Sequence, residues 1–230
     1  MTGAQAIRRF PKTGWRNRFA RWALSLKKRP AATSYLNYQT QTMLTLPFDG
    51  EWYVYWGGRT IARNYHAATR DQRFAYDFLV LHNGKSHRGT GERNTDYFCF
   101  GLAVYAPGNG VVVSMANAEP DLGPGETRLD NPLGNYVILD HGCGEFSFLA
   151  HLRQGSVVVC QGDGVTAGQF IGECGNSGHS SEPHLHYHLQ TTATSFQGEG
   201  LPAQFSQYIA NGKWTLRGEP VAGQKVRNQG

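Results

Sequence analysis

The stretch Gly172–Gln190 joins a glycine-rich loop to three histidines at alternating positions, His184, His186 and His188. In a β-strand every second side chain points to the same face, so these imidazoles should line up together. Neutral imidazole is the commonest metal ligand in proteins and a common acid or base near neutral pH. We therefore expect a reaction centre on this strand. The alternative is a polar, solvated sheet face that happens to be rich in histidine.

Asp77 is a second residue with chemical potential, because it lies within the alternating apolar run 74–80. Burial of an unpaired carboxylate costs several kcal/mol, so Asp77 requires a cation or strong hydrogen-bond donors. A metal ion would meet that requirement, and so would Arg63 or Arg73 in a structural ion pair. The spacing alone does not choose between them.

His151 follows the predicted strand 145–150 directly. A hairpin partner of the 184–190 strand would bring it near the three histidines. The alternative is a histidine at a strand end that caps backbone groups. His82 and His87 fall in a polar, glycine-rich stretch, and we expect both to be solvated loop residues.

The elements that position these residues are predicted to be short antiparallel strands. The length of 230 residues is enough for one large or two small domains. The 29 glycines are typical of a mainly β fold with many tight turns. Segments 81–97 and 117–134 are long polar loops that would wall a groove over the sheet. The predicted strands are 43–50, 51–56, 74–80, 102–106, 110–114, 135–140, 145–150, 156–160, 169–172 and 184–190.

Basic charge is concentrated at the N-terminus. Residues 1–30 hold nine Lys and Arg and no acid, which leaves thirteen basic against seventeen acidic residues, a balance of −4. Within this arm Trp15, Phe19, Trp22 and Leu26 have helical spacing. Such a helix could contact an anionic membrane or polymer, or it could pack on the domain behind it or form a tail. We expect no nucleic-acid binding, because the arm has no recognisable nucleic-acid-binding fold and the rest of the chain is acidic.

No clear signal peptide or membrane span is apparent, since the longest apolar run of the arm is only Trp22–Leu26. The four cysteines, Cys99, Cys143, Cys160 and Cys174, form no Cys-x-x-Cys pair and therefore no zinc ribbon. We expect buried thiols, with one or two disulfides as the alternative. The cysteines do not identify the redox compartment.

Six separated motifs, spread over residues 43–190, carry a resemblance to a known family. With these motifs in the same order as in the family, the chain resembles the lysostaphin-type (LytM-like) zinc endopeptidases, which cut peptidoglycan peptides. The motifs are Asn64-Tyr-His66 with Asp77, residues 102–113, residues 134–141, Ala150-His-Leu152, residues 162–172, and Gly175-Asn-Ser-Gly178 with Pro183-His-Leu-His186.

The resemblance implies a compact antiparallel β core of the duplicated hybrid motif type, with a narrow groove and one Zn²⁺ per chain. Position by position, it makes His66, Asp77 and His186 the metal ligands. It makes His151 and His184 the two catalytic histidines that do not bind the metal. Three protein ligands leave a tetrahedral zinc ion one open position, as in catalytic rather than structural sites.

The chain departs from the family pattern at the first motif, where ten residues separate His66 from Asp77. The usual spacing is four positions, so Asp71 competes for the role of ligand. We prefer Asp77, because it lies in an apolar strand, whereas Asp71 lies in a charged turn. His188 stands where family members often carry an acid, and we assign it no role other than support of a neighbouring ligand.

The resemblance implies a zinc metalloendopeptidase of the cell envelope that hydrolyses peptidoglycan peptides. The alternative from another functional class is a non-catalytic module of the same fold that binds wall peptides or regulates a hydrolase. The same chemistry on a peptide from another source is a third interpretation. We predict three parts of the chain. Residues 1–42 form an arm and connector, residues 43–190 form the metallopeptidase domain, and residues 191–230 form a C-terminal extension packed on that domain.

Overall fold

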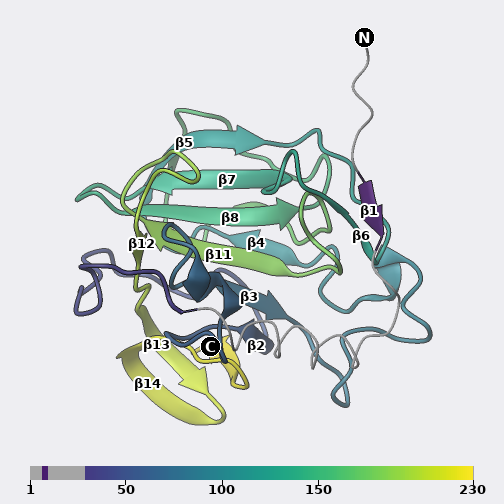
Figure 1. Cartoon of the computed structure of the whole chain (residues 1–230), viewed down its shortest axis with the longest axis horizontal. Helices are drawn as coiled ribbons and strands as arrows, with labels where there is room; N and C mark the ends of the chain where they lie inside the picture. The colour runs from purple at the N-terminus through teal and green to yellow at the C-terminus, as the bar shows by residue number, and fades with distance from the viewer. Residues whose placement is uncertain (1–6, 10–28, 230) are drawn as a thin grey trace.

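The structure, a computed structural model, describes residues 7–9 and 29–229 (Figure 1). Within these residues the regular structure is β-strands and two short 3-10 helices, which confirms the predicted mainly β class. No described residue belongs to a helix long and apolar enough to cross a membrane. The predicted helix through Trp15 and Leu26 lies outside the described residues.

The strands follow the alternating apolar pattern of the sequence. They are β1 (Ile7–Arg9), β2 (Trp52–Trp56), β3 (Tyr76–Leu79), β4 (Ala103–Tyr105), β5 (Gly110–Ala116), β6 (Glu126–Arg128), β7 (Asn135–Asp140), β8 (Phe146–Leu152), β9 (Gly164–Val165), β10 (Phe170–Glu173), β11 (Leu185–Gln190), β12 (Gly200–Leu201), β13 (Phe205–Ala210), β14 (Lys213–Gly218) and β15 (Lys225–Asn228). The 3-10 helices are η1 (Tyr65–Ala68) and η2 (Asn94–Asp96).

One large antiparallel sheet forms the body of the molecule, in the order β14-β13-β15-β2-β3-β11-β8-β7-β5-β9, with β12 paired to β11 (Figure 1). The ribbons β4–β10 and β1–β6 are separate two-stranded sheets. Strand β11 lies near the middle of the large sheet, between β3 and β8. It therefore brings residues from three distant parts of the chain side by side.

The two faces of β11 have different surroundings. Leu185, Tyr187 and Leu189 point into the main hydrophobic core, which also takes in Val104 of β4 and Ile171 of β10. Residues at even positions point to the opposite face, because side chains alternate along a strand. There a smaller apolar cluster around Phe148 and Ile138 borders the histidines. The main core thus fixes the register of β11 and with it the histidine face.

Several predicted strands differ from those observed. Segment 156–160 forms no strand. Val157 and Val159 are buried, which explains the alternating pattern. The segment ends in a turn, in which the side chain of Asp163 accepts from the Cys160 backbone N–H. In segment 43–50 only Leu44 forms a bridge. The predicted loop 117–134 contains β6.

Residues 191–230 contribute β12 to β15, of which β13, β14 and β15 extend the large sheet beyond β2. Their division from the preceding residues as a separate extension stays a prediction. All four cysteines are free thiols. Cys99 and Cys174 are buried as expected, but Cys143 and Cys160 are exposed, so the expectation of buried thiols is wrong for these two.

Candidate metal centre

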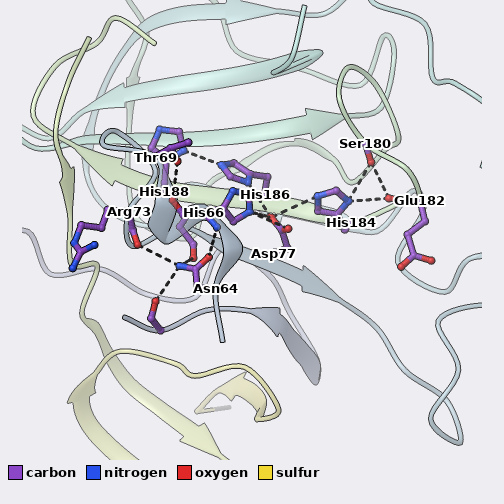
Figure 2. Close-up of polar contacts among 12 residues, drawn as sticks. Asn64, His66, Thr69, Arg73, Asp77, Ser180, Glu182, His184, His186 and His188 are labelled. Atoms are coloured by element: carbon purple, nitrogen blue, oxygen red, sulfur yellow. Dashed lines mark hydrogen bonds and ion pairs between the residues drawn. The ribbon is translucent and has the colours of Figure 1, made fainter. Parts of the chain in front are cut away.

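Asp77 and His186 meet as a directly opposed pair of β3 and β11. Both side chains are buried on the histidine face of the sheet. Oδ1 of Asp77 lies 2.9 Å from Nδ1 of His186 (Figure 2). Opposed residues of an antiparallel pair have Cβ atoms only about 5 Å apart, so the register alone places this carboxylate against this imidazole.

His66 reaches the pair from η1, which Asn64 anchors. The Asn64 side-chain oxygen accepts from the His66 backbone N–H at 3.1 Å, and its amide donates to the carbonyls of Gly58 and Ala75, each at 3.0 Å. Since Ala75 directly precedes β3, one buried side chain fixes the helix against the strand that carries Asp77 (Figure 2). Nε2 of His66 then lies 3.1 Å from both carboxylate oxygens of Asp77.

The rival ligand Asp71 and the candidate ion-pair partner Arg73 make other contacts. Asp71 is buried, but its Oδ2 accepts from the Phe196 backbone N–H at 3.2 Å. The guanidinium of Arg73 faces the Ala67 carbonyl and the Phe74 ring. Within the described chain the ion-pair partners of Asp77 are histidines: His66, His184 and His186.

His151 occupies a β-bulge. The register of β7 and β8 shifts between Asn135, paired with Leu152, and Tyr136, paired with Ala150, so His151 is the extra residue of β8. Its φ of 62° is left-handed, which is strained for a residue other than glycine. Bulges turn side chains out of the regular alternation, and here the ring of His151 comes 4.8 Å from that of His184 and 5.7 Å from that of His186, centroid to centroid.

His151 and His184 share one hydrogen-bonding arrangement. Nδ1 of His151 donates to the Ser177 carbonyl at 2.9 Å, and Nδ1 of His184 donates to the Glu182 carbonyl at 2.8 Å. A carbonyl can only accept, so the proton of each neutral ring sits on Nδ1 and Nε2 carries the lone pair. Nε2 of His184 lies 3.6 Å from Asp77.

Charges in the site favour a cation. Burial raises the pKa of Asp77, but the nearby His66 and His184 and the contact with His186 outweigh it and hold the pKa well below its ordinary value. Burial lowers the pKa of His186, and it lowers that of His151 well below the ordinary value. The group thus combines an ionised carboxylate with two rings, His186 and His151, in which burial favours the neutral form.

The donor set fits a zinc ion. One ligand atom from each of His66, Asp77 and His186 lies within 4.8 Å of the others. Ligands at about 2.0–2.2 Å from a tetrahedral zinc are roughly 3.3–3.5 Å apart, close to the 2.9 and 3.1 Å between Asp77 and the two histidines. Two nitrogens and one oxygen leave the fourth position open.

A cleft lies beside this group and includes Asp77 and His184 in its wall. Its other lining residues are Tyr55, Trp56, Tyr65, Leu79, Thr127, His179, Ser181 and Glu182. These residues come from the predicted strands 51–56 and 74–80, the predicted loop 117–134, the Asn64-Tyr-His66 motif and the glycine-rich loop before His184, but none of them was predicted to line the site. The position of Tyr65 next to His66, and of His179 within the glycine-rich loop, was the available signal. His188 lies away from the cleft, stacked on Phe148 at 4.5 Å between ring centroids.

Comparisons with known proteins concern the part of the chain that includes β8 and β11. Residues 90–197 match the family model of Peptidase family M23. This match confirms the resemblance of this part of the chain to the lysostaphin-type family. His151, His184 and His186 lie inside the match, whereas His66 and Asp77 precede it.

Two curated relatives are similar over part of the chain. One is the peptidoglycan DD-endopeptidase ShyA of Vibrio cholerae serotype O1, 38% identical over 89 residues, which are 39% of this chain and 17% of that protein. The other is an uncharacterized metalloprotease of Buchnera aphidicola subsp. Baizongia pistaciae, 33% identical over 117 residues, which are 49% of this chain and 31% of that protein. The chain thus matches less than a third of either relative's length.

Among solved structures, the M23 metalloprotease pseudoalterin from the deep sea is 17% identical with a TM-score of 0.47. The similarity covers 82% of this chain and all of that one.

Proposed function

We propose that this domain is a zinc metalloendopeptidase that hydrolyses peptide bonds of bacterial peptidoglycan. The observation that carries the proposal is the convergence of His66, Asp77 and His186 beside two further histidines, next to a cleft that Asp77 and His184 line. A structural metal site has no need of two additional histidines whose rings lie beside the ligands. The names of the relatives, a peptidoglycan endopeptidase and a metalloprotease, support the same substrate and reaction.

His66, Asp77 and His186 would hold the zinc ion. A zinc ion with one open position supplies a bound water of lowered pKa and polarises the scissile carbonyl. Asp71 takes no part, because its carboxylate is engaged by the Phe196 backbone.

His151 and His184 do the proton chemistry. Each holds its own proton on Nδ1 against a backbone carbonyl and presents the lone pair of Nε2. One of them accepts the proton of the attacking water at Nε2. The Nε2–H group formed in this way would donate a hydrogen bond to the negative charge on the substrate oxygen and then deliver the same proton to the departing amine. Burial keeps the pKa of His151 well below its ordinary value, so its lone pair is available at neutral pH.

The family resemblance favours the cell envelope, where peptidoglycan lies, as the place of action. The predicted contact of the basic arm with an anionic membrane or polymer concerns mostly residues outside the described part of the chain and stays a prediction.

The test combines zinc content with product analysis. The full chain, prepared without chelator, should contain one zinc per chain and release peptides with new amino and carboxyl ends from purified peptidoglycan. His184→Ala should lower turnover by about 10²–10⁴-fold and keep the zinc. Equal activity of the variant would refute the assigned chemistry, and peptidoglycan binding without turnover by the wild type would identify a non-catalytic module instead.

A further inference from the structure

The side-chain hydroxyl of Thr127 belongs to the wall of the cleft and has no hydrogen-bond partner. Thr127 is fully buried, and its Oγ1 is one of four buried side-chain polar atoms in the described part of the chain that lack a partner. The other three belong to Arg73, His188 and Gln190, none of which lines the cleft. Buried hydroxyls are nearly always paired, because burial removes their bonds to water. An unpaired hydroxyl in a cleft wall therefore indicates a ligand that supplies the missing bond.

Strand β6 holds the Thr127 side chain in this wall. Side chains alternate along a strand, so Arg128 points to the face opposite that of Thr127. The buried Arg128 forms ion pairs with Glu119 at 2.7 Å and with Asp130 at 2.8 Å. The direction of the Thr127 side chain is therefore fixed by ion pairs on the other face of the strand.

One edge of β6 is bonded to the glycine-rich loop that precedes β11. The backbone N–H of Gly125 donates to the Ser181 carbonyl at 2.8 Å, and the backbone N–H of Arg128 donates to the Gly178 carbonyl at 2.9 Å. Backbone groups of successive strand residues point to opposite edges. The N–H and carbonyl groups of Thr127 therefore point away from this loop, to the second edge of β6.

The second edge of β6 is paired with β1 (Figure 1). The two strands are antiparallel, with Arg8 opposite Thr127, and they form a sheet separate from the large one. Because the backbone groups of Thr127 face β1, this pair of residues exchanges both of its hydrogen bonds. Each strand has only three residues, and an isolated ribbon of this kind is marginally stable. Another extended peptide can therefore replace β1, by the strand addition that many peptide-binding proteins use.

We propose that β6 is a docking edge for the peptide substrate. An extended segment of the substrate takes the place of β1 and pairs antiparallel with residues 126–128. The hydroxyl of Thr127 then forms a hydrogen bond with the substrate in the cleft that Asp77 and His184 line. The inference rests on the proposed function, because it assigns the peptide on β6 as the substrate. Backbone pairing depends on the extended shape of a peptide more than on its side chains, so this edge accepts extended peptides of different sequence.

Replacement of Thr127 by valine and by serine tests the role of the hydroxyl. Valine has nearly the same shape without the hydroxyl, whereas serine keeps it. Loss of one hydrogen bond should raise the KM for a soluble peptidoglycan peptide by about 2–12-fold in Thr127→Val, with kcat and zinc content unchanged. Thr127→Ser should keep the KM within about twofold of wild type, because its hydroxyl can form the same bond.

Stability separates a binding role of this hydroxyl from a structural one. The hydroxyl has no partner in the free protein, so Thr127→Val should not lower the urea midpoint of unfolding. Thr166→Val is the control, because Thr166 is exposed after β9 and does not line the cleft; it should change neither the KM nor the midpoint. An unchanged KM in Thr127→Val would refute the role of the hydroxyl in binding, and so would a lower midpoint, which would reveal a structural hydrogen bond.

Amide hydrogen exchange of the metal-free full chain tests the replacement of β1 without turnover. When a soluble peptidoglycan peptide is added, we expect the Arg8 amide to exchange faster, because it leaves β6, and the Thr127 amide to stay protected by the peptide. An Arg8 amide that exchanges at the same rate with and without the peptide would overturn the inference. Turnover by the zinc-loaded chain without these changes would keep the proposed function and overturn the docking edge, whereas these changes without turnover would do the reverse.

Discussion

Replacement of His151 by glycine and by alanine should separate the strain of its backbone from the chemistry of its ring. The two variants lose the same imidazole, the same hydrogen bond to Ser177 and nearly the same packing. They differ in how well they tolerate the φ of 62°. A left-handed conformation costs a residue with a Cβ atom about 1–2 kcal/mol, whereas glycine adopts it freely.

The expected difference follows from two opposing terms. Glycine loses more conformational freedom on folding, which costs roughly 0.5–1 kcal/mol relative to alanine at an ordinary strand position. The relief of strain at residue 151 exceeds that cost. We therefore expect His151→Gly to be more stable than His151→Ala by about 0.5–1 kcal/mol, an inversion of the usual order, and to unfold roughly 1–4 °C higher.

Ser147 in the same strand provides the control. It is buried in β8 and is absent from the positive-φ residues, so Ser147→Ala should be more stable than Ser147→Gly. Urea unfolding of metal-free protein at pH 7.5 would measure all four variants. If the free energy of unfolding of the glycine variant relative to the alanine variant is no higher at position 151 than at position 147, the bulge is not strained. Both His151 variants should lose activity by about 10²–10⁴-fold, since each lacks the imidazole.

Three further predictions concern the ligands, the pH and the arm. Asp77→Asn should abolish measurable zinc binding in a chelator competition, while Asp71→Asn should leave it within about threefold, because only Asp77 faces the histidines; equal losses would contradict the ligand assignment. Burial lowers the pKa of His141, whose Nδ1 donates to the Asn109 carbonyl. The unfolded chain then binds a proton below pH 6.5 that the folded chain does not, so stability in urea should fall as the pH drops from 7.5 to 5.5. His141→Gln should remove at most about 1.4 kcal/mol of that fall per pH unit, and an unchanged pH slope would argue against it. Removal of residues 1–28 takes away β1, which pairs with β6 beside the cleft. We expect β1 to compete with substrate there, so its loss should lower the KM for peptide substrates and leave the zinc affinity unchanged. An unchanged KM would show that β1 does not compete with substrate.

Much of the fold could be predicted because strands with one buried face alternate visibly. Segments 135–140 and 184–190 show this pattern and form β7 and β11. Segment 156–160 shows the same pattern without forming a strand. Val158 donates to the Ile171 carbonyl, but the turn at Cys160 and Asp163 ends the segment before a ladder of such bonds forms. Strand β13, with its mixed polar sequence, was not predicted, since pairing with β14 and β15 rather than its own pattern stabilises it.

The site was less visible in the sequence than the strands were. The bulge at His151 could not be predicted, because nothing in Ala150-His-Leu152 marks a left-handed residue as a glycine would. The role of Asn64 depends on the carbonyls of Gly58 and Ala75, which no sequence pattern marks as its partners. Such contacts become apparent only once the backbone is placed.

Although ten residues separate His66 from Asp77 along the chain, the fold brings their side chains together. The ten intervening residues include the end of η1 and a turn, in which Asp71 binds the Phe196 backbone and Ala75 accepts from Asn64. These contacts return the chain to the start of β3, where the register with β11 sets Asp77 against His186. The distance along the chain can therefore vary, provided that Asn64 ties the helix to β3 and the register of β3 and β11 is kept.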